Sequence, residues 1–453
     1  MSETNLLRRP QAELRALQDR LLRQMVELCY CSHPFYSALM RRERLEPRHI
    51  QSCDDLVRLP PSSKTDFLAD PDAFRLDARE LSVEEGTLWK IIYTTGTTTG
   101  RPAPVYVTAH DHFAYMHVFA QRQDLMGLRK TDLIANLFPL TTFPLGAYSR
   151  APDEAAAVGA AIMFGNTGRP DQSFPVHRGL DDAVRSTAQH KATVLWGVAG
   201  YVRRTLMRAQ ELGVDFRSVR MVMTTGEASS LAMRDDMRRR MRELGCADTL
   251  ILNRYGSTEQ GGSMVECQEG SGFHSIAPDH IFHEVINTES GQRLPDGEPG
   301  MLAFSHLNRR GTVFLRYLVG DVVSISHATC PHCGRTTPRL TSQPVRTGSI
   351  LKVKGTLVNL QNLSEELDRL AALDEYQIVI RPEIADDPFS LDEMLIRVAL
   401  SGAASSDAAE QIVAKAMQLT NVRPRIELAE RNEIFDPLQA PKPRRIVDLR
   451  PPR

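Results

Sequence analysis

Residues suited to binding a polyanion gather in the segment Trp89–Thr108. Two runs rich in β-branched and aromatic residues, Trp89–Thr94 and Val105–Thr108, flank a stretch of threonine and glycine, which predicts two strands joined by a loop. Gly96 and Gly100 permit backbone angles closed to other residues, so main-chain N–H groups can turn toward a ligand. The hydroxyl donors beside them are Thr94, Thr95, Thr97 and Thr98. This composition predicts a loop that wraps a phosphate chain.

The spacing excludes a nucleotide P-loop. That motif has four residues between its two glycines, followed by lysine and then serine or threonine. Here three residues separate Gly96 from Gly100, and Arg101-Pro102 follows. A hairpin turn that carries hydroxyls is the alternative for this segment taken alone, and the motifs further along the chain decide between the two.

The segment resembles the phosphate loop of the adenylate-forming enzymes, the superfamily of acyl-CoA synthetases, peptide-synthetase adenylation domains and luciferases. The usual form of that loop is T/S-S-G-T-T-G-K/R-P. This chain has Thr95 at the usual serine position and one additional residue, Thr99, so the pairing of each threonine with a phosphate oxygen stays open. Earlier in the chain, His33–Tyr36 and Lys64–Phe67 resemble the opening of one branch, the phenylacetate–CoA ligases.

Two further motifs follow in the order that this superfamily requires. Tyr255-Gly256-Ser257-Thr258-Glu259 resembles Y-G-x-T-E, in which the threonine contacts the α-phosphate and the glutamate helps to hold Mg²⁺. A carboxylate suits such a hard cation. Tyr317-Leu318-Val319-Gly320-Asp321 resembles Y-x-x-G-D, whose aspartate binds both ribose hydroxyls with its two acceptor oxygens. Taken alone, the first segment is better explained as a solvated turn, and the alternative for the second is an aspartate in a β-turn after glycine.

The resemblance continues to the C-terminal region. Val345-Arg346-Thr347-Gly348-Ser349 stands where the superfamily has G-R-x-D/K-D, whose arginine also reaches the ribose and which contains the domain hinge. Val345 and Gly348 depart from that pattern, although glycine still suits a pivot. Lys442–Asp448, KPRRIVD, resembles K-A-x-R-V-x-D, whose lysine bridges the substrate carboxylate and the α-phosphate. The proline after Lys442 is unusual, and a solvated basic tail is the alternative.

The remaining site residues are inferred from their position in the chain. Helical patterns alternate with β-rich runs from Ala109 to Tyr255, which predicts a largely parallel sheet with ligands beyond its carboxyl ends. Gly226 and Glu227 follow one such run and join Tyr255 and Gly256 as predicted nucleotide-binding residues. By analogy, the acid is expected among Phe143, Gly146, Ala147, Gly197 and Tyr201. This apolar set suits a flat ring, and no buried cation is identifiable there, which favours an aromatic monocarboxylic acid.

Four residues predict a structural zinc site. Cys330 and Cys333 form a C-x₂-C knuckle followed by glycine, and Cys267 and His274 are the best candidates for the two remaining ligands. His327 or His332 is an alternative to His274, and two unrelated thiols are the simplest explanation. The arrangement resembles zinc-bearing members of the phenylacetate–CoA ligase branch and predicts a closed, non-catalytic Cys₃His site.

Composition sets the remaining limits. The 453 residues carry a net charge of −1, so no general attraction to nucleic acid or to an anionic membrane is expected. The odd count of seven cysteines fits a reducing compartment. The N-terminus has no apolar core of signal-peptide length, and the longest apolar run, Ala155–Gly165, is too short to span a bilayer. We therefore expect a cytoplasmic protein and allow for a homodimer.

The fold class predicted is α/β, with a large N-terminal domain that has mainly parallel sheets and a β subdomain, and a small mobile α+β C-terminal domain. The expected boundaries are residues 1–347, with the β subdomain at about 278–345, and residues 348–453. An amphipathic helix is expected at Gln11–Leu28. The small domain is predicted to contain helices Asn362–Ala371 and Ala408–Leu419, and strands Tyr376–Ile380, Leu395–Val398 and Arg425–Leu428.

The resemblance, which runs from His33 to Arg450, implies an AMP-forming acid–thiol ligase. In such enzymes a carboxylate attacks the α-phosphate of ATP, pyrophosphate leaves, and a thiol then attacks the acyl-adenylate. The implied cofactors are ATP, Mg²⁺, coenzyme A and structural Zn²⁺. A carrier-protein phosphopantetheine arm is the alternative acceptor, and a zinc-knuckle binding protein without catalysis is the rival from a different class.

Overall fold

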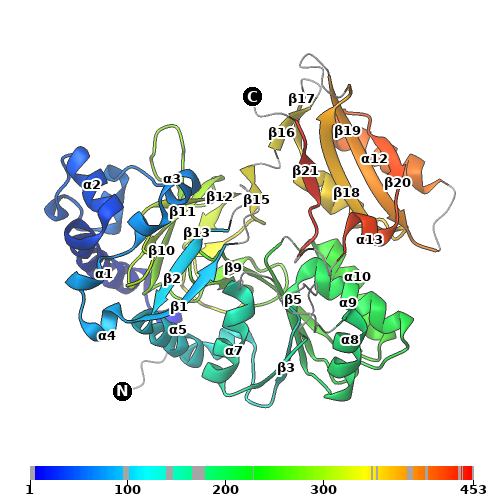
Figure 1. Cartoon of the computed structure of the whole chain (residues 1–453), viewed down its shortest axis with the longest axis horizontal. Coiled ribbons are helices and arrows are strands. Elements are labelled where there is room, and N and C mark those ends of the chain that lie inside the picture. The colour runs from blue at the N-terminus through cyan, green and yellow to red at the C-terminus, as the bar shows by residue number, and fades with distance from the viewer. Residues whose placement is uncertain are drawn as a thin grey trace, which may run out of the picture.

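A nine-stranded sheet forms the centre of the large domain in the computed structural model (Figure 1). Its strand order is β13-β14-β9-β8-β7-β6-β5-β3-β4. The half from β7 to β4 is parallel, whereas β8, β9, β14 and β13 continue the sheet as antiparallel strands. The structure describes residues 6–94, 102–138, 146–165, 179–227, 229–347, 350–353, 356–384, 391–402, 407–436, 440 and 442–450.

The strands of this sheet are short, as expected for a large α/β domain. The parallel half consists of β3 (Leu133–Asn136), β4 (Ala161–Phe164), β5 (Val194–Val198), β6 (Met221–Thr225) and β7 (Leu250–Tyr255). The antiparallel half consists of β8 (Met264–Val265), β9 (Phe273–Ser275), β13 (Ile325–Ser326) and β14 (Arg339–Leu340). The helices that connect or flank the parallel strands are α5 (Ala109–Gln121), α6 (Gln123–Met126), α7 (Gly146–Val158), α8 (Leu180–Gln189), α9 (Ala199–Glu211) and α10 (Leu231–Glu243).

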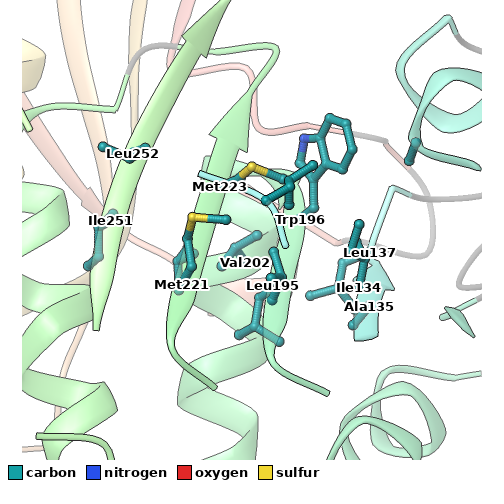
Figure 2. Packing of buried hydrophobic residues seen from close by; sticks show 14 of the residues in the cluster. Ile134, Ala135, Leu137, Leu195, Trp196, Val202, Met221, Met223, Ile251 and Leu252 are labelled. Atoms are coloured by element: carbon teal, nitrogen blue, oxygen red, sulfur yellow. The ribbon is translucent and has the colours of Figure 1, made fainter. Parts of the chain in front are cut away.

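The sequence of the parallel strands explains their position. All five residues of β5 are buried, because helices cover both faces of a parallel sheet and leave no polar side. Helix α10 buries Met233, Met237 and Met241, which are spaced four residues apart and therefore lie on one face. Figure 2 shows Leu195, Trp196, Met221 and Met223 of β5 and β6 in the same apolar cluster as Val202 of α9.

A second, four-stranded antiparallel sheet lies beside the first, in the order β10-β11-β12-β15. Its strands are β10 (Ile281–Ile286), β11 (Gly300–His306), β12 (Tyr317–Val323) and β15 (Val345–Arg346). The N-terminal elements are α1 (Gln11–Ser32), α2 (Pro34–Arg42), α3 (Lys64–Ala69), α4 (Val83–Gly86), the hairpin β1 (Leu88–Tyr93) and β2 (Pro104–Thr108), and five 3₁₀ helices at Leu6–Arg8, Pro47–His49, Cys53–Arg58, Pro71–Phe74 and Ala78–Glu80. Most of them contribute to the apolar cluster of this sheet, namely α1, α2, α3, the hairpin β1–β2 and the 3₁₀ helices at Cys53–Arg58 and Pro71–Phe74, whereas Leu7 of the first 3₁₀ helix packs in the core of the large sheet.

The small domain contains a hairpin, a four-stranded sheet and three helices, and it lies over α9 and α10 in Figure 1. The sheet order is β20-β19-β18-β21, with β18 and β19 antiparallel and both edge strands parallel to their neighbours. The elements are β16 (Ile350–Val353), β17 (Thr356–Asn359), α11 (Leu360–Leu367), β18 (Leu373–Pro382), β19 (Asp392–Leu400), α12 (Ala408–Thr420), β20 (Arg425–Leu428), α13 (Arg431–Ile434) and β21 (Ile446–Asp448).

The predicted fold class is confirmed, and two details differ from expectation. Within the range assigned to the β subdomain, β13 and β14 pair with β9 and so belong to the nine-stranded sheet. Strand β21 was not predicted, because its three residues are too short a run to signal a strand. Among the helices in the described part of the chain, none has the length and apolar character needed to cross a membrane.

A fully buried ion pair joins α10 to the centre of the large sheet. Arg234 Nη1 lies 2.8 Å from Glu266 Oε2, and neither side chain is exposed. The Glu266 carboxylate also accepts hydrogen bonds from the backbone N–H groups of Asn253 and Gly270. Burial raises the pKa of Glu266, and Arg234 opposes that shift, so the glutamate depends on its partners to stay charged.

Replacing Glu266→Ala is expected to lower the free energy of unfolding by about 3–5 kcal/mol, because it leaves Arg234 buried without its counter-ion. Urea unfolding followed by the fluorescence of the buried Trp196 measures this change in the large domain. Glu269→Gln is the matched control, since its ion pair with Arg238 is partly exposed and is expected to contribute less than about 1 kcal/mol. Equal effects of the two changes would contradict the prediction.

Candidate active site

The predicted ribose-binding residues meet where the two sheets adjoin. Tyr255 at the end of β7 donates a hydrogen bond from its hydroxyl to Asp321 Oδ2 at 2.6 Å. Arg346 Nε lies 3.0 Å from Asp321 Oδ1, and the register of β12 with β15 places the two residues opposite each other. Only 4% of Asp321 is exposed, whereas the Arg346 side chain is 60% exposed. Both carboxylate oxygens are therefore fixed, and each keeps a lone pair for a further donor.

The loop after β7 holds Glu259 in a buried position. Gln260 Nε2 lies 2.9 Å from His283 Nε2, and the backbone carbonyl oxygen of Gln260 lies 3.0 Å from His306 Nε2. Gly256 is required here by close packing, because a Cβ on it would lie 2.5 Å from the carbonyl oxygen of Gly262. Glu259, which is 7% exposed, is paired with Lys64 at the start of α3. Thr258 lies in the same turn and is half-buried.

Lys64 was not predicted as a site residue. The sequence placed it in a motif that indicates only the branch of the superfamily, and 195 residues separate it from Glu259. Its ammonium group is the direct partner of the carboxylate expected to hold Mg²⁺. A hard cation fits this carboxylate, and binding it requires Lys64 to share or release Glu259.

Lys442 reaches this site from the small domain. Its Nζ lies 3.4 Å from the carbonyl oxygen of Gly226, in the loop after β6. Burial lowers the pKa of Lys442, and Glu227 and Asp321 oppose that shift while Arg346 adds to it. The structure therefore brings the predicted lysine into electrostatic range of the predicted nucleotide residues, although 121 residues separate Asp321 from Lys442 in the chain.

The phosphate loop is described only at its base. Thr94 is buried, and its Oγ1 accepts a hydrogen bond from the Ala103 N–H at 3.0 Å. The backbone N–H of Thr94 also donates to the Ala103 carbonyl, so this threonine closes the base of the loop. The other predicted residues of this loop lie outside the described residues: Thr95, Gly96, Thr97, Thr98 and Gly100.

The predicted acid pocket is brought together only in part. Tyr201 and Gly197 are fully buried in the core of the large domain, and a Cβ on Gly197 would lie 3.0 Å from Val202 Cγ2. Tight packing thus explains Gly197 without a ligand. Ala147 is half-buried near the start of α7, at which Gly146 is the first residue, and Phe143 lies outside the described residues. The acid pocket therefore stays a prediction.

Arg150 lies on α7, three residues after Ala147. It lines a cavity of about 30 Å³ together with Lys90 and Arg309, and burial lowers its pKa. That volume matches about one water molecule. Ala147, Gly197 and Tyr201 do not line this cavity, so the expectation of a monocarboxylic acid stays a prediction.

Four candidate zinc ligands converge at the antiparallel end of the large sheet. The ligand atoms of Cys267, His274, Cys330 and Cys333 all lie within 4.8 Å of one another. Cys267 Sγ is 4.0 Å from Cys330 Sγ, and Cys333 Sγ is 3.6 Å from His274 Nε2, as expected for ligands around one tetrahedral ion. Burial, with Arg339 and Arg335 nearby, lowers the pKa of His274 to about 4, which keeps it neutral.

The alternative histidine ligands are engaged elsewhere. His332 Nδ1 lies 2.9 Å from Gln268 Nε2, and His327 Nδ1 lies 2.7 Å from Asp296 Oδ1. The donor set of three thiols and one imidazole fits Zn²⁺ and leaves no position for a substrate. Its place between β9 and the loop before β14 suits a structural role.

A model of the family described as AMP-binding enzyme matches residues 16–318, which is about two thirds of the chain. The chain belongs to the AMP-binding enzyme family. The phenylacetate-coenzyme A ligase of Thermus thermophilus is 28% identical over 97% of this chain and 98% of its own length. The enzyme of the same name from Escherichia coli is 25% identical, over 81% of this chain and 79% of its own length.

Solved structures show the same fold. This AMP-binding enzyme matches 2-hydroxyisobutyryl-CoA ligase, in its postadenylation state with 2-HIB-AMP, with a TM-score of 0.80 at 22% identity, over 98% of this chain and 91% of that chain. The same ligase in its thioesterification state, with 2-HIB-AMP and CoA, matches with a TM-score of 0.65 at 24% identity, over 98% of this chain and 91% of that chain. Of these two forms of the ligase, the postadenylation form gives the higher TM-score against this chain.

For this AMP-binding enzyme, we expect about one zinc ion per purified chain, measured by mass spectrometry of metals. Cys330→Ser is expected to lose most of the zinc and to lower the melting temperature by several degrees, because metal binding contributes to folding. Cys246→Ser is the control, since Cys246 is buried away from the four ligands. Metal content far below one zinc in the unmodified protein would refute the site.

Proposed function

We propose that this protein is an AMP-forming acid–thiol ligase. In the first step the carboxylate of the acid attacks the α-phosphate of ATP, and pyrophosphate leaves. In the second step a thiolate attacks the carbonyl carbon of the acyl-adenylate, and AMP leaves. The observation that carries the proposal is the position of Lys442, whose ammonium enters the corner formed by Gly226, Asp321 and Arg346.

The described residues support a division of roles. Asp321 and Arg346 bind the ribose, where the exposed guanidinium can turn toward the sugar while Tyr255 holds the carboxylate. Thr258 donates its hydroxyl to the α-phosphate. Glu259 provides the carboxylate for Mg²⁺, which supplies charge neutralisation to the phosphates when it is bound. The threonines and glycines between Thr94 and Gly100 bind the outer phosphates.

Lys442 acts in the first step only. Its positive charge stabilises the charge that builds up on the α-phosphate oxygens and the attacking carboxylate. In related enzymes the small domain turns about a hinge between the two steps, and Gly348 is the proposed pivot here. The greater similarity to a postadenylation arrangement supports the assignment of this conformation to the first step.

The proposed substrate is an aromatic monocarboxylic acid. Its support is the apolar character of Phe143, Gly146, Ala147, Gly197 and Tyr201, and the names of the phenylacetate-coenzyme A ligases that resemble the chain. A small aliphatic hydroxy acid is the rival, since a solved ligase that the chain matches with a TM-score of 0.80 is named for 2-hydroxyisobutyryl-CoA. Acid-dependent ATP–pyrophosphate exchange across a panel of aryl and alkyl acids tests the proposal. Absence of exchange with every acid would overturn it.

Coenzyme A is the proposed acceptor, and a carrier-protein phosphopantetheine arm is the alternative, because it presents the same thiol. Comparing thioester formation with coenzyme A and with loaded carrier proteins distinguishes them. A zinc-knuckle protein without catalysis is disfavoured by membership of the AMP-binding enzyme family. We also propose that the protein binds Mg²⁺ and Zn²⁺ and that it is located in the cytoplasm.

Replacing Lys442→Ala is expected to reduce acid-dependent ATP–pyrophosphate exchange by about 10²–10³-fold, because the developing charge loses its stabilising cation. Thioester formation from supplied acyl-adenylate should stay within about twofold, since that step does not use Lys442. Arg444→Ala, whose side chain is exposed, is the control. Equal loss of both half-reactions would contradict the role assigned to Lys442.

Replacing Asp321→Ala should instead weaken nucleotide binding. Loss of charge-assisted hydrogen bonds to the ribose hydroxyls is expected to raise the KM for ATP by about 10-fold or more. Steady-state exchange at varied ATP measures this effect. Asp321→Asn retains one acceptor oxygen, so its KM for ATP should lie between those of the unmodified protein and Asp321→Ala. An unchanged KM for ATP in both variants would rule out the ribose assignment.

A further inference from the structure

The two domains meet without a gap where α9 begins. Gly200 is the second residue of this helix and faces Pro443, the residue that follows Lys442. A Cβ on Gly200 would lie 2.9 Å from Pro443 Cγ, 3.1 Å from Pro443 Cδ and 2.8 Å from Glu227 Oε1. Real Cβ atoms essentially never make contacts below 3.0 Å, so only glycine fits this position in the observed arrangement. Pro443 itself is buried.

Glu227 is bound to the same point of α9. The backbone N–H of Gly200 donates to Glu227 Oε1. The first N–H groups of a helix lack partners within the helix, and Val198, the residue before α9, has no polar side chain with which to cap it. A carboxylate at this end is also favoured by the helix dipole. Glu227 therefore caps α9 from the loop that follows β6.

The Glu227 carboxylate also interacts with two cations of the small domain, Arg445 and Lys442. Burial raises the pKa of Glu227 to about 7, and Arg445 and then Lys442 act against that shift. Arg445 is held within the small domain by Glu375 and by the ring of Tyr376, whose centroid is 4.4 Å from the guanidinium carbon. Glu375 is the further acidic group near this site, and it is paired with Arg445. Glu227 thus links a rigid helix end to a rigid edge of the small domain.

We propose that Glu227 is a positioning residue for Lys442, and that Glu227, Gly200 and Pro443 form the docking site that the small domain occupies for the adenylation step. The inference rests on the function proposed above for Lys442. It assigns Glu227 to domain docking, in place of the nucleotide contact expected from the sequence. It also gives the unusual Pro443 a role, because a rigid ring without an N–H group fills the space above Gly200.

Two single variants test the docking site. Glu227→Gln keeps the shape of the side chain and removes its charge toward Lys442 and Arg445. Gly200→Ala places a methyl group where Pro443 lies. Each is expected to lower the rate of acyl-adenylate formation by about 10–100-fold, because a small displacement of a catalytic group has effects of that size. The KM for ATP and the rate of thioester formation from supplied acyl-adenylate should both change less than about twofold.

A suppressor and a control make the test specific. Pro443→Gly removes the ring atoms that a methyl group on Gly200 would meet. The double variant Gly200→Ala with Pro443→Gly should therefore form acyl-adenylate faster than Gly200→Ala alone. On a logarithmic scale, it should recover at least about half of the difference in rate between Gly200→Ala and the unmodified protein. Glu211→Gln is the control, because its 2.9 Å ion pair with Arg431 also crosses the domain interface, away from Lys442. It should leave both half-reactions within about twofold.

Three results would overturn the inference. They are an unchanged adenylation rate in Glu227→Gln, an equal loss of both half-reactions in either variant, or a raised KM for ATP as the main effect of Glu227→Gln, which would restore the nucleotide-binding role. Failure of the proposed function is distinguishable from these results, because the unmodified protein would then show no acid-dependent exchange at all.

Discussion

The site depends on placing one ammonium group, that of Lys442, at a corner built by the other domain. Burial, and to a smaller extent Arg346, lowers the pKa of Lys442, whereas the carboxylates of Glu227 and Asp321 favour its charged form. The segment that carries Lys442 is anchored because β21, four residues later, pairs in parallel with β18. The position of the charge is thus set by a strand pairing in one domain and by two acidic side chains in the other.

The large domain presents its share of the site in a fixed arrangement. Tyr255 and Arg346 hold the two oxygens of Asp321, and Lys64 holds Glu259. Hydrogen bonds to His283 and His306 fix Gln260, the residue after Glu259. Groups that are already oriented need little reorganisation when a charged substrate binds, which is the condition for effective electrostatic stabilisation. The four proposed zinc ligands lie at the antiparallel end of the nine-stranded sheet, where a bound ion would hold the neighbouring segments together.

Local patterns predicted most of what the structure brings together. The alternation of helical and β-rich runs gave the parallel strands β3 to β7, and short motifs with fixed spacing identified Tyr255, Asp321 and Arg346. The knuckle Cys330-x₂-Cys333 led to Cys267 and His274, since a closed zinc site needs four ligands. For the strands and the short motifs, neighbours in the chain carry enough information to define the chemistry, whereas the two more distant zinc ligands followed from the ligand number that zinc requires.

Contacts between distant segments could not be read in the same way. The pairing of Lys64 with Glu259 depends on how distant segments of the large domain pack. The packing of Gly200 against Pro443 depends on how the two domains meet. The burial of Tyr201 and the tight packing of Gly197 likewise follow from the core around β5, which the sequence identifies only as apolar.

The central claim is that this domain arrangement serves adenylation and must change before thiol transfer. The most direct test joins the domains covalently across the Glu211–Arg431 pair, with Glu211→Cys and Arg431→Cys in a background where the exposed Cys31 is replaced by serine. A short bismaleimide then locks the interface. The locked protein should keep acid-dependent ATP–pyrophosphate exchange and lose thioester formation, whereas the same variant without cross-linker should retain both. Thioester formation at an undiminished rate in the locked protein would contradict the account.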